Sequence, residues 1–144
     1  ILDTEINFND RALIPDTYLP VVNERLKVYR SLNDAETCEQ IDQILIDLKD
    51  RCGKPDGEIL NLIENSKLRI IAANVGIKKI YSNHQNAMLT FNDNLTDQVY
   101  KKLIGLIQSG SAKIKLINES KITLDVTENT DKRTAVAKLL NELL

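Results

Sequence analysis

Apolar side chains recur at helical spacing along the second predicted helix, which follows a shorter helix over residues 22–32. Asn33 or Asp34 is the predicted cap of this second helix, because a short polar side chain can accept a hydrogen bond from the first turn. Gly53 is its predicted end, with the left-handed backbone that favours glycine. The apolar positions between these ends are Cys38, Ile41, Leu45, Leu48 and Cys52. Their 3-4-3-4 spacing indicates one buried stripe.

A third helix is predicted over residues 58–75, with Asp56 as its cap and Gly76 after its end. It is apolar on much of its circumference, which is typical of a central buried helix. The pattern then changes to alternation, and two pairs of alternating segments predict two β-hairpins, each followed by a helix. The predicted strands, including a short one near the start, cover residues 4–8, 77–82, 87–91, 113–117 and 121–126.

The predicted order is therefore a lead strand, three helices, a β-hairpin, a helix, a second β-hairpin and a final helix. Because hairpins pair their strands antiparallel, we predict an α+β fold with helices packed on one face of a small, mostly antiparallel sheet. Residues 1–20 are predicted to be a lead-in strand and a proline-rich segment, and residues 21–144 a single domain. The chain starts at Ile1 rather than methionine, so we expect a fragment of a larger protein.

Composition and charge narrow the class of protein. Of the 144 residues, 42% are hydrophobic and 28% are charged, with a net charge of −2, as in ordinary globular domains. This balance offers no basic excess for nucleic acid, and the apolar runs are too short to cross a membrane. Cys38 and Cys52 would lie about 21 Å apart along one helix, too far for a disulfide. They favour a reducing compartment such as the cytoplasm.

The chain offers little for catalysis. His84 is the only histidine, and it falls in a predicted hairpin loop without the cysteine, histidine or carboxylate neighbours that a metal site needs. Residues 105–111 have two glycines at the spacing of a phosphate-binding loop. However, Ser111 stands where that motif has lysine, and the segment ends a predicted helix. We therefore predict no catalytic residue, no metal and no cofactor.

Three groups of lysines suggest an alternative function. If they gathered near one end of the sheet, they would form a basic rim for nucleic acid. Aromatic platforms for bases are few, since the chain has four tyrosines, two phenylalanines and no tryptophan. Solvated surface lysines are the simpler interpretation. The residues concerned are Lys78, Lys79, Lys101, Lys102, Lys113 and Lys115.

The end of the second helix carries a charged face. At about 100° per residue, Asp47 lies about 60° from Asp50 and about 40° from Arg51, and all three point away from the apolar stripe. One interpretation is a solvated face with an Asp47–Arg51 pair inside the helix. The other is a docking face, because two acceptors beside one planar donor can be recognised by a basic partner surface.

The sequence resembles the C-terminal domain of bacterial transcription-repair coupling factors. Residues 13–30 (LIPDTYLPVVNERLKVYR) are similar to that family's proline-acid-x-aromatic-x-proline string, which leads into an arginine-leucine helix. Residues 47–53 (DLKDRCG) are similar to its acid-Leu-x-Asp-Arg-Phe-Gly string, and residues 75–77 (VGI) to its leucine-glycine-isoleucine. The sequence departs from the family at Cys52, where phenylalanine is usual, and at Asp47, where the longer glutamate is usual.

The resemblance implies a function as well as a fold. The family's full-length protein is an ATP-dependent DNA translocase that removes stalled RNA polymerase and recruits nucleotide-excision repair. Its C-terminal domain has no catalysis of its own, packs on the UvrB-like N-terminal module of the same polypeptide and covers the surface that binds UvrA. Asp47, Asp50 and Arg51 fall on positions that the family uses for this contact. The implied partners are that module and, indirectly, UvrA, RNA polymerase and DNA, with no membrane.

Overall fold

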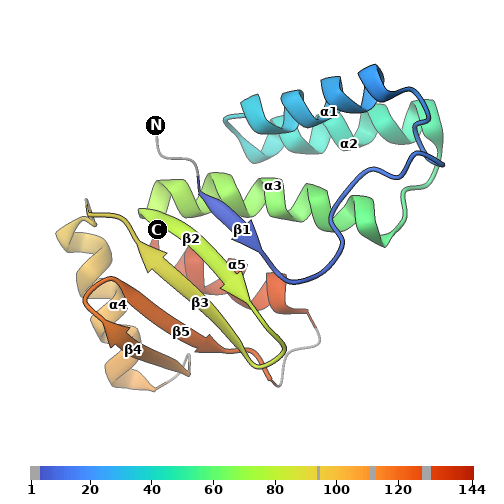
Figure 1. The fold of residues 1–144 in the computed structure, drawn as a ribbon. Helices are drawn as coiled ribbons and strands as arrows, with labels where there is room; N and C mark the ends of the chain where they lie inside the picture. The colour runs from blue at the N-terminus through green and yellow to red at the C-terminus, as the bar shows by residue number, and fades with distance from the viewer. Residues whose placement is uncertain (1–3, 94, 111–112, 128–130) are drawn as a thin grey trace. The chain divides into compact units, whose positions relative to one another are not determined.

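The computed structural model describes residues 4–93, 95–110, 113–127 and 131–144. The chain divides into two compact units (Figure 1). The first, here called the helical unit, is Asp10–Ile70, and the second, called the sheet unit, combines Ile1–Asn9 with Ile71–Leu144. The helical unit is thus continuous in sequence, whereas the sheet unit is assembled from two separated segments.

Three helices supply the helical unit: α1 (Val22–Asp34), α2 (Cys38–Cys52) and most of α3 (Gly57–Val75). All three were predicted from the apolar spacing, although α1 continues two residues beyond the predicted end. The predicted cap of α3 is confirmed, because Asp56 Oδ1 accepts a hydrogen bond from the backbone N–H of Ile59 at 3.1 Å. This bond satisfies one of the donors that the first turn leaves unpaired.

The start of α2 differs from the prediction. Thr37 is its N-cap, and neither Asn33 nor Asp34 can serve because α1 runs through both. The Thr37 hydroxyl accepts a hydrogen bond from the backbone N–H of Gln40 at 3.2 Å, and the Gln40 side chain accepts one from the backbone N–H of Thr37 at 3.4 Å. This reciprocal pair is a capping box, which satisfies two donors at once.

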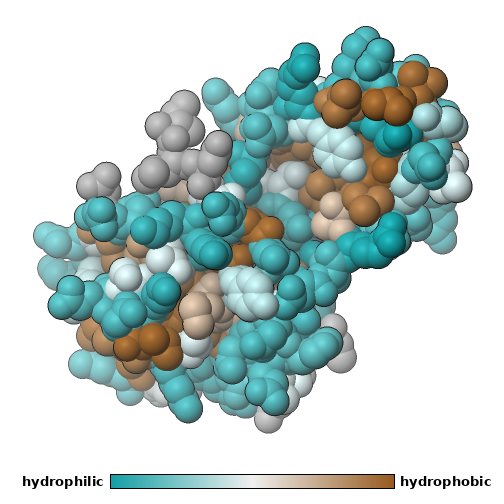
Figure 2. Space-filling view, in the orientation of Figure 1, coloured by the Kyte–Doolittle hydropathy of each residue, from teal (hydrophilic) through white to brown (hydrophobic). Residues whose placement is uncertain are grey.

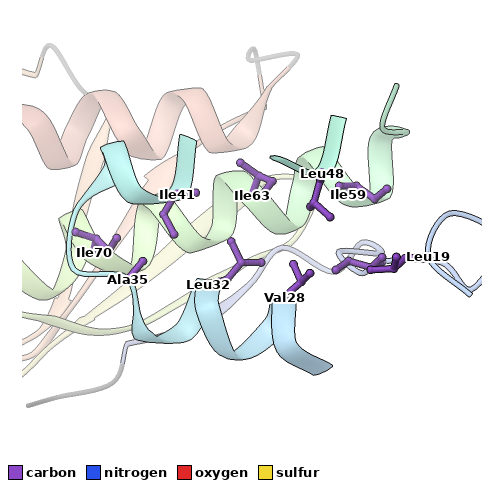
Figure 3. Close-up of a cluster of buried hydrophobic side chains, with 10 residues drawn as sticks. Leu19, Val28, Leu32, Ala35, Ile41, Leu48, Ile59, Ile63 and Ile70 are labelled. Carbon is purple, nitrogen blue, oxygen red and sulfur yellow. The ribbon is translucent and has the colours of Figure 1, made fainter. Parts of the chain in front are cut away.

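The core of the helical unit gathers side chains from all three helices and from the segment before α1 (Figure 3). Ile41 and Leu48 of α2 and Ile59 and Ile63 of α3 are at most 2% exposed. Burial of each such side chain contributes about 1.5–3 kcal/mol to stability, so this cluster holds α2 rigidly on its neighbours. The cluster comprises Ile14, Leu19, Val28, Leu32, Ala35, Ile41, Leu48, Ile59, Ile63 and Ile70.

The sheet unit is built on one mixed sheet with the strand order β1-β2-β3-β5-β4. The two predicted hairpins, β2 with β3 and β4 with β5, are confirmed, and β5 joins them by pairing with β3. Among the described strands, β1 alone pairs in parallel, with β2. The predicted α+β class is therefore confirmed. The strands are β1 (Glu5–Asn7), β2 (Ile77–Ser82), β3 (Asn86–Phe91), β4 (Ile114–Asn118) and β5 (Lys121–Asp125).

The two faces of this sheet differ in burial. Ile80, Leu89 and Ile122 are paired in register across the three central strands and are fully buried. The helices α4 (Asp97–Ser109) and α5 (Lys132–Leu143) both lie behind the sheet in Figure 1. Since successive side chains of a strand point to opposite faces, the other face of the sheet carries the polar positions.

Candidate docking surface

The three charged residues singled out in the sequence lie at the C-terminal end of α2. Asp47, Asp50 and Arg51 are all exposed, whereas Leu48, next to Asp47, is 2% exposed. The helical repeat explains the contrast, because Leu48 lies about 100° around the axis from Asp47. The structure therefore places the three charges on the outer surface of a helix whose inner face is fixed in the core.

Arg51 forms an ion pair with α1 rather than with its own helix. Its Nη2 atom lies 3.2 Å from Oε2 of Glu24, while Oδ1 of Asp47 accepts a hydrogen bond from Nε2 of Gln43 at 3.0 Å. The Asp47–Arg51 pair considered from the sequence thus gives way to two other contacts. The Arg51 and Glu24 side chains are 52% and 44% exposed, so their pair contributes at most about 1 kcal/mol. Its main consequence is to fix the direction of the guanidinium.

Asp50 differs from its two neighbours. Within the described part of the chain, no hydrogen bond or ion pair joins its carboxylate to another side chain. It is an exposed anion on a rigid helix. A cationic group from elsewhere can therefore approach it without displacing an internal partner.

The end of α2 is held in place by Tyr18, from the proline-rich segment. The Tyr18 hydroxyl lies 2.7 Å from the carbonyl oxygen of Gly53, to which it donates, and 3.2 Å from that of Leu48. Burial raises the pKa of Tyr18, with smaller contributions from Cys52 and Asp56. The phenol therefore stays protonated and keeps its donor at physiological pH. This part of the family-like segment 13–30 thus supports the helix end that carries the three charges.

Gly53 ends α2 with φ of 90° and ψ of −165°. The positive φ agrees with the prediction, but ψ lies outside the left-handed helical region that the prediction assigned to it. This conformation is essentially restricted to glycine. The backbone N–H of Gly53 donates to the carbonyl oxygen of Lys49 at 2.9 Å, which closes the last turn.

The structure spreads the proposed lysine rim over different surfaces. Lys79 and Lys115 lie on the outer face of the sheet, which is the face opposite α4 and α5. In the strand register, Lys79 is aligned with Glu5, and Lys115 is aligned with Tyr81. Lys102 belongs to α4, on the opposite side of the sheet, and its ammonium contacts the backbone oxygen of Leu144. The six lysines therefore do not form one continuous rim.

The segments tested for catalysis take ordinary structural roles. His84 is exposed in the turn between β2 and β3. Gly105 lies inside α4, and Gly110 is its left-handed C-cap with φ of 67°, while Ser111 lies outside the described residues. Among the described residues, no three or more His, Cys, Asp or Glu side chains are placed to hold a metal ion. No helix in the described ranges is both long and apolar enough to cross a membrane.

Sequence reasoning missed Glu24 as a member of the charged surface. Its partner Arg51 lies 27 positions away, on another helix. Spacing within one helix cannot reveal such a pair, since it depends on how α1 packs against α2. The available signal was weaker: Glu24 is the acidic residue in the first turn of a helix whose other early side chains are apolar, amide or basic.

Comparison with known proteins finds relatives that share one name. The curated transcription-repair-coupling factor of Escherichia coli (strain K12) is 27% identical to this chain over 143 residues, which are 97% of the chain and 12% of that relative. The one from Buchnera aphidicola subsp. Acyrthosiphon pisum is 38% identical over 89 residues, or 62% of the chain and 11% of the relative. The chain therefore spans only a small part of the length of these relatives.

A solved structure shares the fold. The crystal structure of a C-terminal domain of transcription-repair coupling factor matches this chain with a TM-score of 0.78 at 16% identity, covering 99% of this chain and 92% of the other. The model of the TRCF domain family matches residues 8–102, which include both the helical unit and the first hairpin. Because that match spans more than half of the sequence, this chain belongs to the TRCF domain family.

Proposed function

We propose that this TRCF domain is a non-catalytic regulatory domain of an ATP-dependent DNA translocase that couples transcription to nucleotide-excision repair. It docks on the UvrB-like N-terminal module of the same polypeptide and covers the surface that would otherwise bind UvrA. The observation that carries the proposal is the outward face of Asp47, Asp50 and Arg51 at the end of α2. Membership of the family supports it, since the relatives are named transcription-repair-coupling factors.

The charges of this face suit a basic partner surface. Asp50 presents a carboxylate without a side-chain partner in the described structure, and Asp47 engages only the neutral amide of Gln43. Arg51, already neutralised by Glu24, adds a planar donor of fixed direction. A partner with arginine or lysine opposite the two aspartates would form charge-assisted hydrogen bonds, which are stronger than bonds between neutral groups.

A modest interface is sufficient for this role. Two modules in one polypeptide meet at a high effective concentration, so each contact needs little free energy of its own. A ratio of docked to undocked domain of 99:1 requires about 2.7 kcal/mol. This is half of the free energy that shifts such an equilibrium from 1:99 to 99:1. A few interfacial charge pairs can supply this, since close desolvated pairs couple at about 1.5 kcal/mol or more.

The test is Asp50→Lys in the full-length protein that contains this chain. Reversing this charge places like charges opposite each other and opens the docked state, so UvrA affinity is expected to rise at least tenfold. Titration of the full-length protein with labelled UvrA measures the change. An unchanged UvrA affinity would contradict the proposed role of Asp50.

The matched control is Glu119→Lys, which makes the same charge change at an exposed residue of the sheet unit. It is expected to leave UvrA affinity at the wild-type value. A similar rise in both variants would show that net charge, rather than this face, governs UvrA binding.

A further inference from the structure

Two side chains at the end of α2 that could pair with each other are paired elsewhere. Asp47 and Arg51 are four positions apart, with the acid nearer the N-terminus, which is the better order for an ion pair within a helix. Arg51 instead contacts Glu24 of α1, with Nη2 and Oε2 3.2 Å apart. Oδ1 of Asp47 accepts a hydrogen bond from Nε2 of Gln43 at 3.0 Å. The pair within α2 is therefore open, although both of its members are present.

The two replacement contacts differ in their effect on charge. Gln43 is neutral, so its hydrogen bond leaves the negative charge of Asp47 uncompensated. Glu24, in contrast, compensates the positive charge of Arg51 from another helix. Among the described residues, no ion pair joins Asp47 to a cation. Lys49, the cation nearest to Asp47 in the sequence, lies about 160° away from it around α2.

The place of Glu24 on α1 directs it towards α2. Val22 and Leu26 are 57% and 54% exposed at the start of α1, where Figure 2 shows hydrophobic side chains at the surface. Glu24 lies about 160° around the helix from both, so it points away from this apolar surface. An acid in the first turn also suits the helix dipole. That role requires no particular partner, so it does not account for the contact with Arg51.

We propose that Glu24 is a positioning residue of the docking face, which holds Arg51 away from Asp47 and so keeps the Asp47 carboxylate available to the partner module. This inference rests on the proposed function and adds to it a residue outside α2. Without the contact to Glu24, Arg51 would turn to Asp47, because the four-residue spacing brings their opposite charges together. The resulting pair would neutralise an anion that a basic partner recognises.

Two substitutions separate the contact from the charge. Glu24→Gln removes the negative charge, whereas Glu24→Asp keeps it at the start of α1 and shortens the side chain by one bond of about 1.5 Å. Since the contact with Arg51 is already 3.2 Å long, the shorter aspartate is expected to lose it. Both variants should therefore release Arg51, although only one changes the net charge. Asp34→Asn is the control, because it removes the same charge from an exposed residue at the other end of α1.

The first measurement follows Arg51 by NMR in this chain and does not depend on docking. Asp47→Asn should move the Nε–Hε resonance of Arg51 little when Glu24 is present, and clearly further in the Glu24→Asp and Glu24→Gln backgrounds. The Asp34→Asn background should behave as the wild type does. An equal movement in all backgrounds would overturn the proposal, because Arg51 would then sense Asp47 whether or not Glu24 held it.

The second measurement is the UvrA affinity of the full-length protein at about 0.05 M salt, where exposed charges are weakly screened. Glu24→Gln and Glu24→Asp are each expected to raise this affinity about twofold, which corresponds to the strength of an ion pair at this spacing. Asp34→Asn should leave it at the wild-type value. A rise in Glu24→Gln alone would overturn the proposal, since the charge rather than the contact with Arg51 would then matter.

Comparison with Asp50→Lys separates this inference from the proposed function. If Asp50→Lys raises UvrA affinity and neither Glu24 variant does, the role of Glu24 is wrong and the docking function stands. If none of the three variants changes it, the docking function fails and the role of Glu24 in docking fails with it. Thermal unfolding of each variant checks that the domain remains folded.

Discussion

At the scale of single residues, the docking face depends on one backbone conformation. Gly53 has φ of 90° and ψ of −165°, a region in which a side chain costs about 1–3 kcal/mol. A Cβ atom added at Gly53 would meet no other atom within 4 Å. The cost of a substitution there is therefore purely conformational, and it falls on the turn that ends α2.

We accordingly expect Gly53→Ala to lower the free energy of unfolding by about 1–3 kcal/mol. Gly105→Ala is the matched control, because Gly105 lies inside α4 and its added Cβ would also meet nothing within 4 Å. In a helix interior alanine is better than glycine by about 0.5–1 kcal/mol, so this change should stabilise the protein. Urea unfolding measures both, and equal effects of the two substitutions would contradict the account of Gly53.

At the scale of elements, α2 begins at a residue fixed by side-chain hydrogen bonds and ends at a glycine. The capping box of Thr37 and Gln40 fixes where the helix begins. The start lies next to α1, which ends at Asp34. The buried stripe of Ile41 and Leu48 sets which side of α2 faces outward.

The capping box gives a second stability prediction. Thr37→Ala removes the acceptor for the backbone N–H of Gln40 and should lower the free energy of unfolding by about 1 kcal/mol. Thr37→Ser keeps the hydroxyl and should retain most of the stability. Denaturant titration measures the free energy of unfolding of both variants. An equal loss of stability in Thr37→Ser would contradict the role of the cap, because serine keeps the hydroxyl and lacks only the methyl group.

Sequence reasoning succeeded for elements whose signals are local. The stripe containing Ile41 and Leu48, the cap at Asp56 and both hairpins follow from spacing and turn residues alone. The N-cap of α2 was missed because several short polar residues compete between positions 33 and 37, and the choice depends on where α1 ends. The parallel pairing of β1 and the Glu24–Arg51 ion pair depend on tertiary packing, which periodicity does not encode.

At the scale of the whole molecule, the distribution of charge separates docking from nucleic-acid binding. The net charge is −2. Lys79, Lys115 and Lys121 do share the outer face of the sheet with Tyr81, but Glu5 lies directly opposite Lys79 in the register. With Asp125 of β5 also on this side, the face carries three lysines, two acids and one aromatic ring, which is a poor match for a polyanion.

We therefore expect the chain to bind single-stranded DNA negligibly at physiological salt. Fluorescence titration with a labelled oligothymidine at two salt concentrations measures this. Three phosphate contacts would instead give a slope of about −2 in log K against log salt. If such a slope appears and Lys79→Gln lowers its magnitude by about 0.7, the nucleic-acid alternative holds and the outer sheet face is its site.

The parallel pairing of β1 with β2 also determines the order of folding. Thr4 donates a buried hydrogen bond to the carbonyl oxygen of Ile77 across 73 positions of sequence, at 2.7 Å. During synthesis β1 leaves the ribosome before β2, and the whole helical unit emerges between these two strands. Closing so long a loop is slow compared with helix formation. The surface that carries Asp50 is therefore complete before β1 can pair with β2.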